Sequence, residues 1–264
     1  MRWIPLGTNG FFPSYGRQTM SFLLHDAQRA LVLDAGSGLG RLVEPEVRRA
    51  IADRDRLDIL LTHYHLDHVV GLAFLPGLWD RAVRIFGPRR PLVDAEPQAV
   101  LERLVAPPLF PGRLDELGLP IEVEAYDGDS LSIAGLHLSL RRQRHPGGSV
   151  GVRVGEELAY VTDTEPDPGT VVLCAGVDTL LHEVWSSRAE AAAPGYQPRG
   201  HSSTEAVAEI ADGAGVGRLV PVHHRPDRDA EAVRALADEL AGLVSCSVLL
   251  AAEGEEQTTG GDAR

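Results

Sequence analysis

Short apolar or alternating runs recur along the chain up to residue 161, and most have the length of a β-strand. The run 57–61, Leu-Asp-Ile-Leu-Leu, is typical, because charged residues precede it and polar residues follow it. Runs of this kind, bounded by polar or turn-forming residues, indicate strands. The predicted strands lie near residues 20–26, 30–34, 57–61, 82–86, 121–125, 131–143, 149–154 and 157–161.

Other segments carry their apolar residues at helical spacing. The segment 203–214 has one apolar face, and Ser202 with Glu205 three positions later forms a capping-box pattern at its start. The predicted helices cover residues 44–53, 93–105 and 203–214, with a later one that starts after Asp229, and a last strand covers 246–251. Strands interrupted by helices, followed by strand-helix alternation, suit two sheets between helical layers.

Length and composition fit one enzyme domain. A chain of 264 residues with 44% hydrophobic content can bury a large core. We expect a single domain over 1–251, an irregular Pro- and Gly-rich loop over 106–120 and a disordered, polar tail over 252–264. No apolar run approaches the roughly 18 residues of a membrane span, and Pro5 and Gly7 interrupt the N-terminus before a signal region could form. We therefore expect a cytoplasmic protein with no membrane partner.

The charge of the chain restricts its partners. A formal net charge of −13 makes nucleic acid an unlikely partner, because binding along a phosphate backbone needs a basic surface. A small anionic substrate remains compatible with this charge. Basic residues gather near the histidines described below, namely Arg141, Arg142, Arg144, Arg199 and Arg225.

Residues 62–68 read Thr-His-Tyr-His-Leu-Asp-His and directly follow the predicted strand 57–61. Imidazole nitrogens and carboxylate oxygens are ligands of zinc and other first-row metals, and so many unpaired polar groups are too costly to fill a core. In an extended segment His63, His65 and Asp67 share one face, and the turn into the next helix brings His68 beside them. The loop can therefore supply ligands to two neighbouring metal ions. It differs from H-E-x-x-H, which places two ligands around a single zinc.

The H-x-H-x-D-H segment after an apolar strand resembles the signature of the metallo-β-lactamase superfamily. Further segments resemble, in order, landmarks of its ribonuclease Z and cyclic-phosphate phosphodiesterase branch. They are Leu6–Thr8 with Pro13, Leu33–Gly36, His145, Tyr160–Thr164, His182–Glu183, Gly200–Ser203 and Leu219–His223. The resemblance implies an α/β fold, a four-layer αββα sandwich of two mixed β-sheets flanked by helices. Dimers are common in the family, so it also implies a homodimer.

By position, the resemblance assigns seven residues to two divalent metal ions. The set for one ion is His63, His65 and His145, and the set for the other is Asp67, His68 and His223. Asp163 would bridge the two ions. Zinc is the expected metal, with manganese or iron as alternatives. His224 directly follows His223 and stays open as an outer donor or as the ligand itself.

A pair of metal ions would supply the nucleophile, but the leaving group still requires an acid to protonate it. Two ions about 3.5–4 Å apart lower the pKa of a shared water toward about 7, so bridging hydroxide can attack without a serine or cysteine. Asp67 would act in this centre as a metal ligand. The resemblance gives His201 the role of the acid that protonates the leaving group, oriented by Glu183. Because His201 lies just ahead of a predicted helix, we expect its pKa to be lowered.

These features predict a dinuclear metal hydrolase, a phosphodiesterase acting on a small or cyclic phosphodiester. One alternative is a thioester or lactone hydrolase, which would use the same hydroxide on a carbonyl group. A ribonuclease Z-like RNA endonuclease should carry a protruding Gly- and basic-rich arm, and the region 87–125 is too short for one. A mononuclear iron oxygenase and a non-catalytic binding module are the remaining alternatives.

Overall fold

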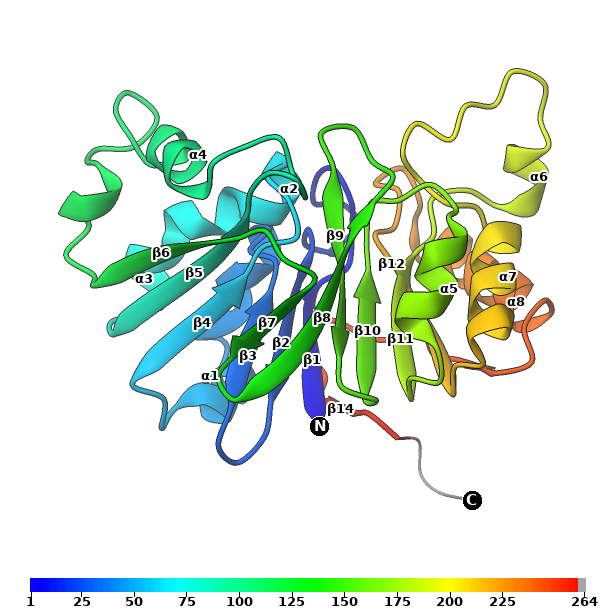
Figure 1. Cartoon of the computed structure of the whole chain (residues 1–264), viewed down its shortest axis with the longest axis horizontal. Helices are drawn as coiled ribbons and strands as arrows, with labels where there is room; N and C mark the ends of the chain where they lie inside the picture. Colours follow the sequence, from blue (N-terminus) through cyan, green and yellow to red (C-terminus); the bar gives the residue numbers. More distant parts are fainter. Residues whose placement is uncertain (261–264) are drawn as a thin grey trace.

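Two mixed β-sheets of seven strands each face one another, and helices cover their outer faces (Figure 1). The computed structural model describes residues 1–260. This architecture confirms the sandwich of two mixed sheets flanked by helices that the sequence predicted.

The first sheet contains the N-terminal strands. Its order is β14-β1-β2-β3-β4-β5-β6; β1 to β3 pair antiparallel and β3 to β6 pair parallel. The bounds are β1 Arg2–Gly7, β2 Ser21–His25, β3 Ala30–Leu33, β4 Arg56–Leu60, β5 Ala82–Pro88, β6 Ile121–Tyr126 and β14 Gln257–Thr258.

The second sheet has the order β13-β12-β11-β10-β9-β8-β7. Strands β7 to β10 pair antiparallel and β10 to β13 pair parallel. The bounds are β7 Ser130–Ile133, β8 Leu136–Gln143, β9 Ser149–Val154, β10 Leu158–Val161, β11 Thr179–Glu183, β12 Arg218–Val222 and β13 Ser247–Val248.

The helices divide between the two outer faces. On the side of the first sheet are α1 Pro45–Ile51, α2 Leu66–Val69, α3 Leu75–Leu78 and α4 Pro97–Leu104, together with 3-10 segments at Ser37–Val43, Val70–Phe74 and Leu114–Glu116. On the side of the second sheet are α5 Pro168–Cys174, α6 Arg188–Ala191, α7 Thr204–Ala214 and α8 Ala230–Ala241. No helix within residues 1–260 is long and apolar enough to cross a membrane.

The alternation of side chains along each strand separates three apolar layers. In β2, Phe22 and Leu24 belong to the layer between the sheets, whereas Leu23 belongs to the layer under the first set of helices. Tyr160 of β10 packs against Phe22 across the sandwich, with ring centroids 5.4 Å apart. Burial of side chains of this size contributes about 1.5–3 kcal/mol each. The packed sandwich therefore holds the loops at its edge in fixed positions.

Several element boundaries differ from the sequence prediction. The expected strand 131–143 is a hairpin of β7 and β8, because Ala134 and Gly135 take positive φ values of 51° and 74° in a tight turn. Helix α4 begins at Pro97 and not at residue 93, since proline suits the first helical turn. Ser203, and not Ser202, caps α7. The last predicted strand, 246–251, shortens to β13.

The polar segment after residue 251 is ordered up to residue 260, in contrast to the disordered tail that its composition predicted. Strand β14 pairs with β1, with Thr258 opposite Arg2. The Glu253 carboxylate accepts hydrogen bonds from the backbone N–H groups of Thr8 and Gln18, at 2.8 and 3.0 Å. Polar residues here satisfy groups of the first sheet, which composition alone does not reveal. Residues 261–264 of the predicted tail lie outside the described residues.

Candidate metal centre

Loops at one edge of the sandwich bring the predicted metal ligands together. His63 follows β4, Asp163 follows β10 and His223 follows β12, so each lies just past the carboxyl end of a strand. The carboxyl ends of parallel strands are the usual place for ligand sites in α/β sheets. His145 joins them from the turn between β8 and β9.

Four residues form the first group of ligand atoms. His63, His65, His145 and Asp163 can each direct one such atom to a common point, with all four atoms within 4.8 Å of one another. His145 Nε2 lies 3.0 Å from His65 Nδ1 and 3.5 Å from Asp163 Oδ1. Asp163 is therefore beside the three histidines that the sequence assigned to one ion.

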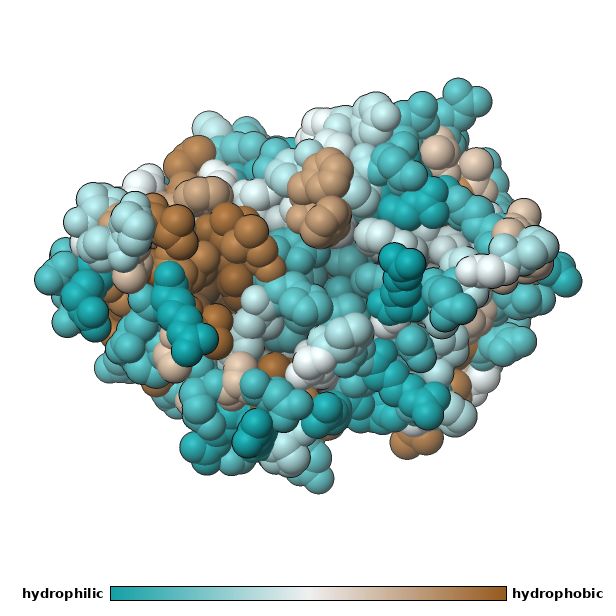
Figure 2. Space-filling view, turned by 90° about the horizontal axis from the view of Figure 1, so that it is seen from above, coloured by the Kyte–Doolittle hydropathy of each residue, from teal (hydrophilic) through white to brown (hydrophobic). Residues whose placement is uncertain are grey.

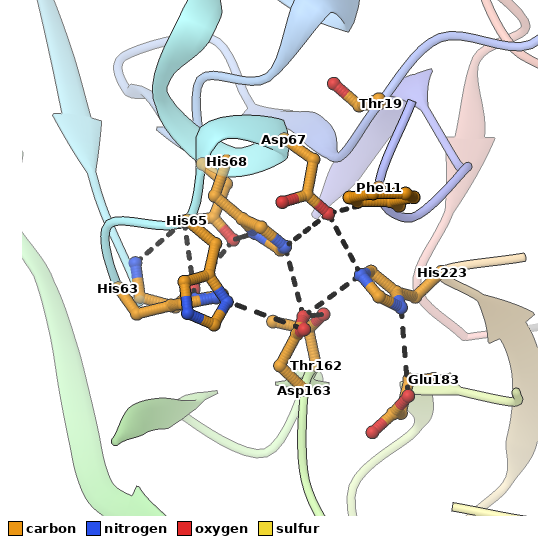
Figure 3. A network of polar contacts seen from close by, with 12 residues as sticks. Phe11, Thr19, His63, His65, Asp67, His68, Thr162, Asp163, Glu183 and His223 are labelled. Atoms are coloured by element: carbon orange, nitrogen blue, oxygen red, sulfur yellow. Dashed lines mark hydrogen bonds and ion pairs between the residues drawn. The ribbon is translucent and has the colours of Figure 1, made fainter. Parts of the chain in front are cut away.

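A second group consists of Asp67, His68 and His223, whose ligand atoms also lie within 4.8 Å of one another. His223 Nε2 is 3.3 Å from Asp67 Oδ2 and 3.2 Å from Asp163 Oδ2 (Figure 3). His68 Nε2 is 3.0 Å from the same oxygen of Asp163. Asp163 thus faces the first group with Oδ1 and the second with Oδ2.

The protonation of these residues fits a divalent cation. Burial alone would raise the pKa of Asp163, but His223, His68 and His63 hold it well below its usual range. Burial and the neighbouring His68 keep the pKa of His63 well below its usual value, so its imidazole is neutral. The Nε2 atom of His63 is buried without a hydrogen-bond partner among the described residues. Ionised carboxylates and unpaired imidazole nitrogens are what a metal ion needs.

His68 shows which charge the cluster accommodates. Burial would lower the pKa of His68, but Asp67, Asp163 and Asp34 raise it well above its usual value. The pocket of carboxylates therefore favours one positive charge at this point. A divalent cation held by Asp67, His68 and His223 would supply that charge in place of the proton.

Asp34 has a role that the sequence analysis did not assign. It follows β3, is fully buried, and its Oδ2 accepts hydrogen bonds from His68 Nδ1 and from the Tyr160 hydroxyl, both at 2.8 Å. Its Oδ1 accepts from the Thr62 backbone N–H at 2.7 Å. A carboxylate that binds one ring nitrogen of a histidine directs the other nitrogen toward a metal. The signal in the sequence was a carboxylate at the end of an apolar strand.

Backbone strain is concentrated at the same residues. Asp34, Asp163 and His223 have positive φ values of 56°, 49° and 55°. Such conformations cost about 1–3 kcal/mol for residues other than glycine and are frequent at functional sites. These three residues lie just past the ends of β3, β10 and β12, and their shared strain supports a functional role for this edge.

His201 and Glu183 form a pair beside the second group. The Glu183 carboxylate is buried and lies 2.8 Å from His201 Nδ1 through Oε2. Burial would lower the pKa of His201, but Glu183 raises it to about 9. The expected lowering by the following helix is therefore wrong, because the carboxylate is in direct contact with the ring. The Trp185 ring stacks on the His201 ring, with ring centroids 4.4 Å apart and an angle of 14° between the ring planes.

The cluster opens into a pocket of about 460 Å³. It is lined by Phe11, His65, Leu66, Asp67, His145, Pro146, Asp163, Trp185, Arg199, His201 and His223. Arg199 is the one arginine among these lining residues. Of the other arginines noted in the sequence, Arg144 pairs with Asp167 at 3.4 Å and Arg225 with Asp227 at 2.7 Å. These two arginines are thus paired with carboxylates outside the pocket, and Arg199 is the arginine that lines it.

His223 and His224 point to different parts of the molecule. His223 takes part in the metal-ligand groups, whereas His224 lines a separate pocket with Thr8 and Arg17. The structure therefore places His223, and not His224, at the cluster. His224 is buried, and its Nδ1 has no hydrogen-bond partner among residues 1–260.

Gly10 leaves the room that the His223 ring occupies. A Cβ at residue 10 would come within 2.4 Å of His223 Cε1 and 2.6 Å of Nε2. We expect Gly10→Ala to displace the ring and to lower metal affinity about 10–100-fold, as other disturbances of ligand orientation do. Gly77→Ala is the matched control, because no atom lies within 4 Å of its Cβ. Metal titration of both variants provides the measurement, and wild-type affinity for Gly10→Ala would contradict the expectation.

Comparison with known proteins places the chain in a family. The sequence pattern described as "Beta-lactamase superfamily domain" matches residues 29–224. The chain is 31% identical to "Ribonuclease Z" of Mycobacterium avium (strain 104) over 90% of this chain and 92% of that protein. It is 27% identical to "Ribonuclease BN" of Cronobacter sakazakii (strain ATCC BAA-894) over 92% and 95%, respectively.

Solved structures share the fold. The metallo-beta-lactamase fold protein YhfI from Bacillus subtilis superimposes with a TM-score of 0.74 at 18% identity, covering 97% of this chain and 98% of that one. A diphosphatase from the PhnP family superimposes with a TM-score of 0.66 at 15% identity, covering 97% of this chain and 96% of that one. The short form of human tRNase Z superimposes with a TM-score of 0.67 at 19% identity, covering 98% of this chain and 100% of that one.

Proposed function

The chain belongs to the β-lactamase superfamily, in its ribonuclease Z-like branch of metal-dependent hydrolases, and on this premise we propose that it is a dinuclear phosphodiesterase acting on a small or cyclic phosphodiester. One observation carries the proposal: Asp163 presents one carboxylate oxygen to each of two groups of ligand atoms. His63, His65 and His145 would hold one ion, Asp67, His68 and His223 the other, with Asp163 shared. A bound pair of divalent ions supplies an activated water and polarises the phosphoryl oxygen.

His201 and Glu183 handle the proton that hydrolysis requires. Glu183 engages His201 Nδ1, so Nε2 is the ring nitrogen that remains to donate. With a pKa raised to about 9, after burial is offset by Glu183, the imidazole carries both protons at neutral pH. Water adds to phosphorus and releases one proton, the bond to the leaving oxygen breaks, and that oxygen takes the proton from His201. The proton released by water restores the charged imidazole through solvent. The products are a phosphomonoester and an alcohol, which remain one molecule when the diester is cyclic.

Arg199 and the volume of the pocket support a small substrate. A pocket of about 460 Å³ accommodates one small molecule, and it has a single arginine to meet a phosphoryl oxygen. A polyanion would need more unpaired positive charge along its path. The net charge of −13 acts in the same direction.

RNA cleavage is the second candidate, because the curated relatives are named ribonucleases. Between the end of β5 and the start of β6, the described chain forms α4, a 3-10 turn and loops, with no extended arm. A panel of bis(p-nitrophenyl) phosphate, 2′,3′-cyclic nucleotides, acyl thioesters and a precursor tRNA separates the candidates. Turnover of thioesters or precursor tRNA with no activity on the small phosphodiesters would overturn the proposal.

Metal content tests the dinuclear part of the proposal. We expect close to two transition-metal ions per chain after reconstitution, because six terminal ligands and one shared carboxylate are present. Asp163→Ala should lower the content below one ion per chain, since it removes a ligand from both groups. Elemental analysis provides the measurement. A content of no more than one ion per chain in the reconstituted wild-type protein would contradict the dinuclear centre.

A further inference from the structure

Phe11 occupies a position at the mouth of the pocket that folding does not explain. Its side chain is 70% exposed, so the ring gains little from burial. Its backbone is held at a φ of 64°, a conformation that costs about 1–2 kcal/mol for a residue with a Cβ. The Phe11 N–H donates to Asp67 Oδ2 at 2.7 Å, which fixes the residue against a predicted metal ligand. Strain at an exposed aromatic residue beside a site indicates a role in that site.

Leu66 is a second apolar side chain in the same position. It lies between His65 and Asp67, is 62% exposed, and lines the pocket together with Phe11. Viewed from above, apolar side chains gather over the half of the molecule that holds the first sheet, whereas the half with the second sheet is mostly hydrophilic (Figure 2). Leu66 is the first residue of α2, after β4, and Phe11 lies between β1 and β2, so both belong to connections between strands of the first sheet.

The proton donor lies on the opposite side of the cluster. Figure 3 shows Phe11 on the Asp67 side of His223 and Glu183 on the other side. Because Glu183 holds His201, the acid belongs to that second side, together with Trp185. A leaving oxygen must be near the acid. The substituent that stays on phosphorus is then directed to the apolar side.

We propose that the pocket takes a phosphodiester whose retained substituent is an apolar or aromatic group packed against Phe11 and Leu66. This inference rests on the proposed phosphodiesterase function. The leaving group departs as an alcohol on the His201 side, and the apolar substituent remains on the phosphomonoester product. The single Arg199 matches the one negative charge of such a diester.

Two esters with the same leaving group test the inference: phenyl p-nitrophenyl phosphate and methyl p-nitrophenyl phosphate. The quantity of interest is the ratio of their kcat/KM values, because the retained substituent is the part that differs. We expect the metal-loaded wild-type protein to favour the phenyl ester. Phe11→Ala should reduce the ratio about tenfold, mainly through KM, since stacking on the ring is lost. Leu66→Ala should reduce it by a smaller factor.

Matched variants separate a contact with substrate from a structural effect. Phe74→Ala and Leu109→Ala remove exposed apolar side chains that do not line the pocket, and both should keep the wild-type ratio. Phe11→Leu retains apolar area and should restore part of the preference. Metal content should stay unchanged in Phe11→Ala, because the backbone N–H to Asp67 remains.

The outcomes distinguish this inference from the function on which it rests. Turnover of both esters by Phe11→Ala with an unchanged ratio would overturn the inference alone. Loss of metal together with equal loss on both esters would also overturn it, because Phe11 would then only support Asp67. No turnover of either ester by the metal-loaded wild-type protein would overturn the proposed function, and the inference with it.

Discussion

An Asp67→Ala variant is expected to lose about a thousandfold or more in turnover while it remains folded, because metal polarisation of the substrate supplies several kcal/mol of transition-state stabilisation. Burial would raise the pKa of Asp67, but His68 and His223 hold it well below its usual range. The carboxylate is therefore ionised and available to a cation. It lies in the first turn of the four-residue α2 and not in an apolar layer.

The control for Asp67→Ala is another buried carboxylate. Asp58 in β4 is 4% exposed and pairs with Arg56 and Arg84 at 2.8 and 3.1 Å, away from the metal-ligand groups. Asp58→Ala should cost stability without abolishing turnover of the folded fraction. Turnover at saturating metal, metal content and circular dichroism distinguish the two variants. Near wild-type turnover by Asp67→Ala would remove Asp67 from the centre.

The metal-ligand groups were the part of the site most open to sequence analysis. His63, His65, Asp67 and His68 lie in one short loop, so their proximity is dictated by the chain itself. His145, Asp163 and His223 are far apart in sequence, and only the family resemblance linked them to that loop. The structure brings all seven together.

Features that depend on tertiary contacts escaped the sequence. The family resemblance predicted that Glu183 orients His201, but the direction of the pKa shift was missed, because it depends on direct contact between the His201 ring and the buried Glu183 carboxylate at the end of β11. Asp34 reads locally as a turn residue, and its part in orienting His68 emerges only when β3 and α2 are adjacent. Similarly, the polar segment around Glu253 looked disordered because its partners, Thr8 and Gln18, lie at the other end of the chain.

Replacing His201 is expected to discriminate between leaving groups. His201→Ala should lower turnover about 10²–10⁴-fold on phosphodiesters with basic leaving groups such as alkyl alcohols, the usual contribution of a general acid. On p-nitrophenyl esters the loss should be less than about tenfold, because p-nitrophenolate leaves without a proton. His137→Ala removes an exposed histidine of β8 and should leave both rates unchanged.

Two readouts decide whether His201 is an acid, a metal ligand or a structural residue. Its ligand atom lies within 4.8 Å of those of Asp163 and His223, so metal content must be measured with the rates. Unchanged metal content with selective loss on basic leaving groups supports the acid. Glu183→Gln should then show a weaker loss with the same selectivity, because Glu183 acts through His201 Nδ1. Equal loss on both substrate classes would exclude His201 as the acid, and loss of one metal ion would make it a ligand.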